Sequence, residues 1–192
     1  AYYDSTIANY FLSKTNKKFP KKKIIHSNLI EKLRYGENPH QEAAIYSLKK
    51  ELNLKQLNGK KLSYNNYNDI FAALLISRSL PKNIGTVIIK HANPCGVSIN
   101  KNSLKSYKLA LACDPISAFG GVVSCNYKIK KNLALELKKL FLEVIICKGI
   151  DSKAIKILKN KKNLRIIDVS NLKNNDLINI SSQQNFHLLQ TS

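Results

Sequence analysis

At residues 87–98 the chain reads Val-Ile-Ile-Lys-His-Ala-Asn-Pro-Cys-Gly-Val-Ser. The apolar start of this stretch predicts a short buried strand, and its Asn-Pro and Gly residues predict a turn directly after it. Ligands of open α/β sheets bind beyond the carboxyl ends of strands, so Lys90 and His91 could supply an acid and a base there. On spacing alone, an ordinary surface Lys-His pair at a strand end stays open as the alternative.

Helical and strand patterns alternate along the rest of the chain. Helices are predicted after the possible caps Asn68-Asp69, Ser103 and Asp151, and a further helix carries Leu133, Leu137 and Leu140. The first of these has its apolar face at Phe71, Leu74 and Leu75. Strands are predicted at residues 84–90, 118–125, 143–147 and 164–169. Such alternation predicts an α/β fold, a mainly parallel sheet with helices on its faces, and residues 170–185 form a polar loop.

The chain of 192 residues is strongly basic, with a formal net charge of +20. That charge raises a basic nucleic-acid-binding domain as one hypothesis. Three observations argue against it: only Arg34, Arg78 and Arg165 are arginines among 32 basic residues, the lysines are spread out, and no nucleic-acid motif is present. The densest run, residues 14–23, is expected to be a solvated loop. We therefore expect no nucleic-acid partner, although positive potential favours small anionic ligands by steering.

The four cysteines contain no C-x-x-C pair and no histidine at metal-ligand spacing. They predict free thiols in a reducing cytoplasm. No apolar run approaches the ~20 residues needed to span a bilayer, so no membrane partner is expected. The chain begins at Ala1 and contains no methionine, which suggests a piece of a longer product.

Four further blocks accompany the Lys-His stretch: residues 33–41 (Leu-Arg-Tyr-Gly-Glu-Asn-Pro-His-Gln), 62–66 (Leu-Ser-Tyr-Asn-Asn), 114–121 (Asp-Pro-Ile-Ser-Ala-Phe-Gly-Gly) and 141–146 (Phe-Leu-Glu-Val-Ile-Ile). Together and in this order they closely resemble the transformylase half of the bifunctional purine biosynthesis proteins. That family pairs AICAR (aminoimidazole carboxamide ribonucleotide) formyltransferase with IMP cyclohydrolase. The resemblance runs from the first residues to about residue 168.

The resemblance implies a three-layer, cytidine-deaminase-like α/β sheet with helices on its faces. Residues 1–23 resemble the last helix of the cyclohydrolase domain and its linker. Residues 24–192 resemble the first transformylase subdomain, incomplete at its C-terminus. The zinc-deaminase pattern H-x-E with P-C-x-x-C is not met, because Asn93 follows His91 at the glutamate position and Ser98 follows Cys95 at the second cysteine position. No metal is therefore expected.

The resemblance also implies an activity: transfer of a formyl group from the co-substrate 10-formyltetrahydrofolate to the 5-amino group of AICAR, giving FAICAR. The parent protein is expected to be a cytoplasmic homodimer. The 192 residues alone are expected to be inactive, because family contacts from a second subdomain would follow Ser192. A noncatalytic nucleotide-binding remnant with the same fold is the alternative.

Formyl transfer between nitrogens needs a base near the amine and a cation near the developing oxyanion. By resemblance, His91 matches the catalytic histidine and Lys90 the lysine that stabilises the transition state. An imidazole can accept a proton at neutral pH, while an ammonium stays charged. Consecutive strand residues point to opposite faces, so the strand must end or twist at Lys90 for both to reach one substrate.

By the same resemblance, five residues bind the nucleotide: Arg34, Tyr35, Gly120, Glu143 and Lys162. A guanidinium suits phosphate because it offers paired, charge-assisted donors. From the residues themselves, a surface ion pair for Arg34, a half-buried core aromatic for Tyr35 and strand geometry for Gly120 stay open. Some family members carry aspartate where this chain has Glu143, and Lys162 could equally be solvated.

Overall fold

The computed structural model describes residues 2–15, 19, 21–22, 24–47, 52–172, 178–183 and 186–191. The chain divides into two compact units, residues 1–52 with 62–67 and residues 53–61 with 68–192. Ala1, Ser192 and part of the lysine run at 14–23 lie outside the described residues.

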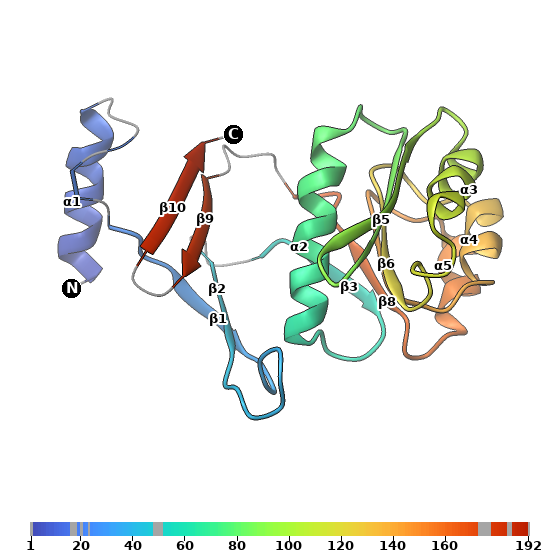
Figure 1. Ribbon diagram of the computed structural model, residues 1–192, viewed down its shortest axis with the longest axis horizontal. Helices are drawn as coiled ribbons and strands as arrows, with labels where there is room; N and C mark the ends of the chain where they lie inside the picture. Colours follow the sequence, from blue (N-terminus) through green and yellow to red (C-terminus); the bar gives the residue numbers. More distant parts are fainter. Residues whose placement is uncertain are drawn as a thin grey trace. The chain divides into compact units, whose positions relative to one another are not determined.

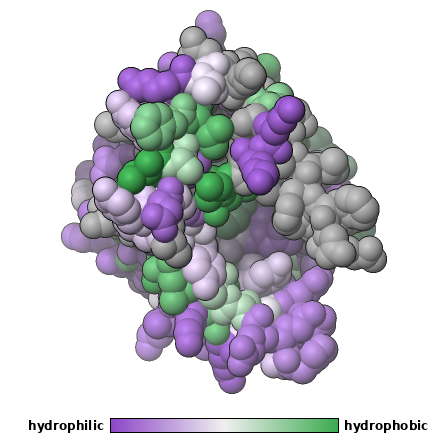
Figure 2. All heavy atoms as spheres, turned by 90° about the vertical axis from the view of Figure 1, so that its left-hand side faces the viewer, coloured by the Kyte–Doolittle hydropathy of each residue, from purple (hydrophilic) through white to green (hydrophobic). Residues whose placement is uncertain are grey.

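The first unit contains helix α1 (Tyr2–Lys14) and an antiparallel hairpin of β1 (Asn28–Lys32) and β2 (Ala44–Ser47). No residue of α1 is buried. Large hydrophobic side chains of α1 are exposed: Tyr2, Tyr3, Ile7, Tyr10 and Phe11. Figure 2 shows apolar side chains lying among hydrophilic ones on the face that it draws. Within the described part of the chain, no helix is long and apolar enough to cross a membrane.

The second unit is built on a six-stranded sheet with the order β3-β8-β7-β6-β4-β5. Its strands are β3 (Lys55–Asn58), β4 (Gly85–Lys90), β5 (Asn93–Ile99), β6 (Gly121–Cys125), β7 (Leu142–Cys147) and β8 (Arg165–Asp168). Its helices are α2 (Tyr64–Ser79, whose first four residues fall in the first unit), α3 (Ser103–Cys113), α4 (Lys131–Leu137) and α5 (Ser152–Lys159). Helix α2 covers one face of the sheet, and α3, α4 and α5 cover the other (Figure 1).

The central strands are continuous apolar runs because both of their faces are covered. Alternate residues such as Ile88, Val123 and Ile145 join the core cluster beneath α3, α4 and α5. The residues between them, such as Val87 and Val144, are also fully buried. The four predicted central strands are therefore present, although β6 starts at Gly121, three residues after the predicted start at residue 118.

The prediction of a mainly parallel sheet is wrong. Among the described strands of this sheet only two pairings are parallel, β6 with β7 and β7 with β8. The stretch predicted as a turn at residues 93–96 is instead the start of the edge strand β5, which forms an antiparallel hairpin with β4. Pro94 is tolerated there because an edge strand need not donate from every N–H, and Cys95 is the extra residue of a bulge opposite Ile88 and Ile89.

The predicted helices are present, but two caps and one face differ, and α4 ends at Leu137, before the predicted helical residue Leu140. Helix α2 begins before Asn68-Asp69: the Ser63 N–H donates to Asn66 Oδ1 (3.1 Å), and the Asn66 N–H donates to Ser63 Oγ (3.2 Å). This reciprocal pair is a capping box, which fixes the start of the helix. Phe71 and Leu75 are exposed, whereas Ile70, Ala73 and Leu74 are buried.

The N-termini of helices α3 and α5 differ in how their N-cap side chains are bonded. Asn102, rather than Ser103, caps α3, because its Oδ1 accepts from the Lys105 N–H at 3.0 Å. Asp151 occupies the N-cap position of α5 as predicted, but its carboxylate pairs with Lys128 Nζ at 2.6 Å.

The polar segment 170–185 is not entirely a loop. Strands β9 (Ile178–Gln183) and β10 (Phe186–Thr191) pair in an antiparallel hairpin, and residues 173–177 and 184–185 lie outside the described residues. Composition favoured a loop here, but Ile178 and Ile180 alternate with polar residues, which is the pattern of a strand.

Candidate active site

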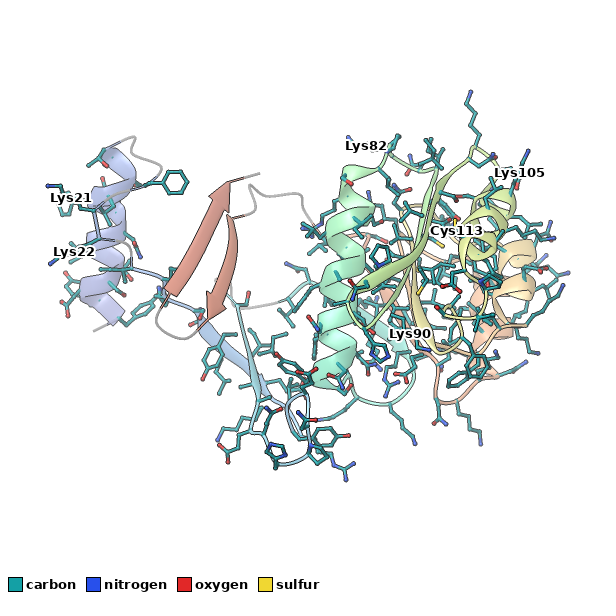
Figure 3. All side chains as sticks on the ribbon, in the orientation of Figure 1. Lys21, Lys22, Lys82, Lys90, Lys105 and Cys113 are labelled. Carbon is teal, nitrogen blue, oxygen red and sulfur yellow. The ribbon has the colours of Figure 1, made fainter. Side chains whose placement is uncertain are left out.

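Lys90 is the last residue of β4, and it is partly exposed after five fully buried residues. Strand β4 runs antiparallel to β6, so Lys90 lies at the end of the sheet where β6 begins. Figure 3 shows Lys90 at the end of the sheet opposite to Lys82. The Lys90 ammonium donates a hydrogen bond to the Phe119 carbonyl oxygen at 2.9 Å. The lysine therefore joins β4 to the loop that precedes β6.

His91 and Ala92 form the two-residue turn between β4 and β5, with φ of 52° and 59°. Two left-handed residues in succession define a type I′ hairpin turn, which normally uses Asn-Gly. The His91 side chain is exposed. The backbone carbonyl oxygen of His91 accepts a hydrogen bond from Asn93 Nδ2 at 2.8 Å. The Ala92 N–H donates to Asp69 Oδ1 at 2.7 Å. Because the strand ends at Lys90, strand alternation no longer forces the His91 side chain to the face opposite Lys90.

The loop 114–120 is folded on itself beside Lys90. Asp114 Oδ1 accepts from the Ser117 N–H at 2.9 Å, and the Ala118 N–H donates to the Asp114 carbonyl oxygen at 3.2 Å. Hydrogen bonds from Ser117, and to a smaller extent the charge of Lys90, lower the pKa of Asp114 below its ordinary value. The Asp114 carboxylate therefore stays ionised at neutral pH near the Lys90 ammonium.

Gly120 connects this loop to β7. Its φ is +74°, and its N–H donates to the Phe141 carbonyl oxygen at 2.9 Å. The rings of Phe119 and Phe141 lie 5.2 Å apart, and both are more than half exposed. Large exposed aromatic side chains beside a polar strand end offer a surface on which a flat ring can stack.

Next to Phe141 lies a pocket of about 470 Å³ whose lining includes Lys60, Glu143, Lys162 and Arg165. A carboxylate oxygen of Glu143 lies 3.7 Å from a guanidinium nitrogen of Arg165. Lys162 is exposed at this pocket. The lining thus combines several cations with one carboxylate, a set that can hold a phosphate and accept from hydroxyl groups.

The neighbouring Lys161 differs from Lys162. Its ammonium donates to the Leu140 carbonyl oxygen at 2.7 Å, and desolvation followed by the charge of Lys138 lowers its pKa. The local chain thus anchors Lys161 to the protein backbone and leaves Lys162 exposed.

Arg34 and Tyr35 belong to the first unit. The Arg34 guanidinium carbon lies 5.6 Å from the centroid of the half-buried Tyr35 ring. Arg34 and His40 line a second pocket of about 470 Å³, contained within that unit. The loop is closed by the Gly36 N–H, which donates to the Gln41 carbonyl oxygen at 2.7 Å.

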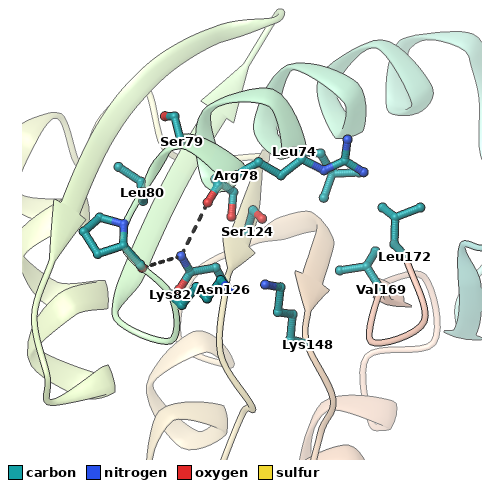
Figure 4. A pocket seen from close by; sticks show the side chains of 12 residues that line it. Leu74, Arg78, Ser79, Leu80, Lys82, Ser124, Asn126, Lys148, Val169 and Leu172 are labelled. Carbon is teal, nitrogen blue, oxygen red and sulfur yellow. Dashed lines mark hydrogen bonds between the residues drawn. The ribbon is translucent and has the colours of Figure 1, made fainter. Parts of the chain in front are cut away.

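A third pocket, of about 300 Å³, lies at the opposite end of the sheet, where β6, β7 and β8 end (Figure 4). Both the nitrogen and the oxygen of the Asn126 side chain are hydrogen-bonded within the protein. Its Nδ2 donates to the carbonyl oxygens of Pro81 (2.9 Å) and Ser77 (3.4 Å), and its Oδ1 accepts from the Gly85 N–H (2.8 Å). None of the seven predicted site residues lines this pocket. The predicted site residues of the second unit lie instead at the carboxyl end of β4 and near the starts of β6 and β7.

The structure brings five of the seven predicted residues to one end of the sheet in the second unit. Lys90 contacts Phe119, Gly120 contacts Phe141, and Phe141 lines the same pocket as Glu143 and Lys162. His91 follows Lys90 in the hairpin turn. Sequence reasoning missed Phe119, Phe141, Arg165 and Asp69; the first two belong to the quoted blocks, whereas nothing local marks Asp69.

The described residues contain no group of three or more His, Cys, Asp or Glu side chains that could hold a metal ion. All four cysteines are unpaired thiols. What the fold and site define is an α/β protein with a Lys-His strand end beside a cationic pocket.

Comparison with known proteins gives the family. A family model described as AICARFT/IMPCHase bienzyme matches residues 1–192. The chain is 40% identical over 174 residues to the bifunctional purine biosynthesis protein PurH of Oceanobacillus iheyensis, covering 88% of this chain and 34% of that protein. It is 42% identical over 185 residues to PurH of Caldicellulosiruptor saccharolyticus, covering 92% of this chain and 36% of that protein. The chain belongs to the AICARFT/IMPCHase bienzyme family.

The chain spans about a third of the length of the curated relatives that it matches. Among solved structures, RibD of Acinetobacter baumannii aligns with 52% of this chain and 34% of its own, at 19% identity and a TM-score of 0.39. That similarity is too low to define the fold, so the family rests on the sequence matches.

Proposed function

We propose that this chain forms part of the formyl-transfer site of a bifunctional purine biosynthesis protein. In this proposal 10-formyltetrahydrofolate donates a formyl group to the 5-amino group of AICAR. The observation that carries it is the strand end at Lys90 and His91, joined through Phe119 to a cationic pocket, in a chain whose family is named for this activity.

The roles follow from the chemistry of the step. His91 would accept the proton that the amine loses as it attacks the formyl carbon. The Lys90 ammonium would stabilise the oxyanion that develops on the formyl oxygen. Proton loss from the amine and protonation of the departing folate nitrogen balance, so no metal or oxidant is needed.

Nucleotide binding is assigned to the remaining residues. Glu143, Lys162 and the Gly120 backbone would contact the ribonucleotide from the second unit. Arg34 and Tyr35 of the first unit are also proposed to bind the nucleotide, because Arg34 lines a pocket of that unit and a guanidinium suits phosphate.

The wider assignments are proposals of the same kind. Residues 1–23 would form the end of a cyclohydrolase domain and its linker, which helix α1 supports because none of its residues is buried. Residues 24–192 would form the first transformylase subdomain with a cytidine-deaminase-like fold. The full-length protein would work as a homodimer in the cytoplasm, where the four unpaired thiols stay reduced. The 192 residues alone would have negligible activity.

The test is a formyltransferase assay on the full-length protein with His91→Asn and His91→Ala. Asparagine tolerates the left-handed backbone of this turn, so His91→Asn removes the imidazole without adding strain. We expect turnover to fall by roughly 100-fold or more in both variants. Lys90→Ala is assayed in the same way and should also lower turnover, because it removes the proposed oxyanion contact. Lys105→Ala, at an exposed lysine of α3, is its matched charge-loss control.

The alternatives give different results in the same experiment. Near-normal turnover of His91→Asn removes this histidine from the mechanism. Tight AICAR binding by a wild-type protein without formyl transfer supports a noncatalytic nucleotide-binding role. Salt-dependent binding to arbitrary DNA supports a nucleic-acid-binding domain.

A further inference from the structure

A carboxylate outside the proposed substrate contacts holds the turn that carries His91. Asp69 lies in the second turn of α2, and its Oδ1 accepts the Ala92 N–H at 2.7 Å. This bond joins α2, on one face of the sheet, to the hairpin between β4 and β5. Asp69 is half-buried and is therefore partly shielded from water that would compete for the Ala92 N–H.

The turn needs such support because its sequence does not favour its shape. Both His91 and Ala92 have positive φ, and neither is glycine. A side chain in the left-handed region crowds the following carbonyl, and type I′ turns avoid this cost with Asn-Gly. Strained residues of this kind persist only where the surrounding structure holds them, and they gather at functional sites.

The hydrogen bond from Ala92 has the strength to do this. An N–H that donates to a carboxylate makes a charge-assisted bond, about twice as strong as a bond between neutral groups. The second bond at the turn, from Asn93 Nδ2 to the His91 carbonyl oxygen, is local to β5 and does not tie the turn to another element. Among the described contacts of the His91 and Ala92 backbone, the bond to Asp69 is thus the one that reaches a helix.

We infer that Asp69 is a positioning residue: by holding the Ala92 N–H, it fixes the His91 imidazole relative to the Lys90 ammonium. This inference rests on the proposed function for its catalytic consequence. A base displaced by about 1 Å can lose about 100-fold in rate, so a bond that fixes the turn can matter without touching substrate. Among the described hydrogen bonds, Asp69 bonds to the Ala92 N–H and not to the His91 or Lys90 side chain.

The kinetic test uses the full-length protein with Asp69→Ala and Asp69→Asn. We expect Asp69→Ala to lower kcat by about 10- to 100-fold while KM for the nucleotide changes by less than about 3-fold, since the nucleotide contacts lie elsewhere. Asp69→Asn keeps an oxygen acceptor and should recover most of the lost kcat. Asp151→Ala is the control, because it also removes a carboxylate that bonds to another part of the second unit, and it should leave kcat near wild type.

A double-mutant comparison separates positioning from general damage. Ala92→Gly makes the turn intrinsically favourable, so Asp69→Ala should cost less kcat in the Ala92→Gly background than in the wild-type background. Equal losses in the two backgrounds would overturn the inference. If Asp69→Ala does not fold, the comparison is made with Asp69→Leu, which is similar in size and offers no acceptor.

Amide hydrogen exchange tests the inference without any activity. In the full-length protein, Asp69→Ala should speed exchange of the Ala92 N–H at least about 10-fold and leave the Ile88 N–H of β4 unchanged. Unchanged exchange at Ala92 would overturn the inference even if formyl transfer is observed. If the wild-type protein shows no formyl transfer, that result counts against the proposed function. The exchange experiment still tests whether Asp69 holds the turn.

Discussion

The ammonium of Lys90 donates a hydrogen bond to the carbonyl oxygen of Phe119, 2.9 Å away and 29 residues later in the chain. This bond ties the end of β4 to the loop that leads into β6. It also leaves the Lys90 charge close to Asp114, whose pKa it helps to lower. The protein itself therefore holds the ammonium in place, as the proposed stabilisation of a developing oxyanion by Lys90 would require.

Two buried tyrosines form a matched pair for a stability test. The Tyr127 hydroxyl contacts Thr86 Oγ1 at 2.6 Å and donates to the Ser103 carbonyl oxygen at 3.1 Å. Within the described part of the chain, the buried Tyr107 hydroxyl has no hydrogen-bond partner. We expect Tyr127→Phe to lower the free energy of unfolding by about 1–3 kcal/mol, since it leaves buried polar groups unpaired, and Tyr107→Phe to be neutral or stabilising. Urea denaturation of the chain measures both, and a larger loss for Tyr107→Phe would contradict the assigned hydrogen bonds.

Two glycines should respond differently to alanine. A Cβ on Gly96 would overlap the carbonyl oxygen of Ala110 in α3, so we expect Gly96→Ala to cost ~3 kcal/mol or more. A Cβ on Gly120 would lie 3.5 Å from the Phe141 ring, an ordinary contact, so the cost there comes from its positive φ and is about 1–2 kcal/mol. Thermal unfolding of the two variants ranks them. Equal stability losses would mean that α3 does not pack this closely on β5.

The four thiols should react with a disulfide reagent in a fixed order at pH 8. Cys113 is exposed and should react first. Burial, followed by the charge of Asp114, raises the pKa of the partly exposed Cys95, so it should react more slowly. Burial raises the pKa of both Cys125 and Cys147 to about 12, so these thiols should react only after unfolding. Peptide mapping by mass spectrometry identifies the labelled residues, and rapid labelling of Cys125 in the folded chain would disprove its burial.

Asp114 should contribute to stability in a pH-dependent way. Its pKa is lowered in the folded chain, so the folded state favours the ionised carboxylate. The contribution is present above the unfolded pKa of about 3.9 and is lost as the pH falls through the folded value. The melting temperature of the wild-type chain should therefore exceed that of Asp114→Asn at pH 6, and the difference should shrink below about pH 4. A difference that grows towards acid pH would reverse the assigned direction of the shift.

The amino-acid sequence by itself determined four central strands, helices α2 to α5 and the Lys-His strand end. The buried strands at residues 84–90, 143–147 and 164–169 are confirmed to within a residue or two, because covering both faces of a strand requires a continuous apolar run. The blocks at 114–121 and 141–146 marked Gly120 and Glu143 as site residues by resemblance. Their roles in binding stay predictions.

Strand direction and the supporting contacts were decided only by the tertiary structure. An apolar run records that a strand is buried but not which way it runs, so the hairpin of β4 and β5 followed from positive φ at His91 and Ala92. Asp69 resembled a helix cap because a cap is a local feature, whereas its bond to Ala92 joins residues 23 apart. Contacts of that range depend on how the helix and the sheet pack together, and no local pattern encodes them.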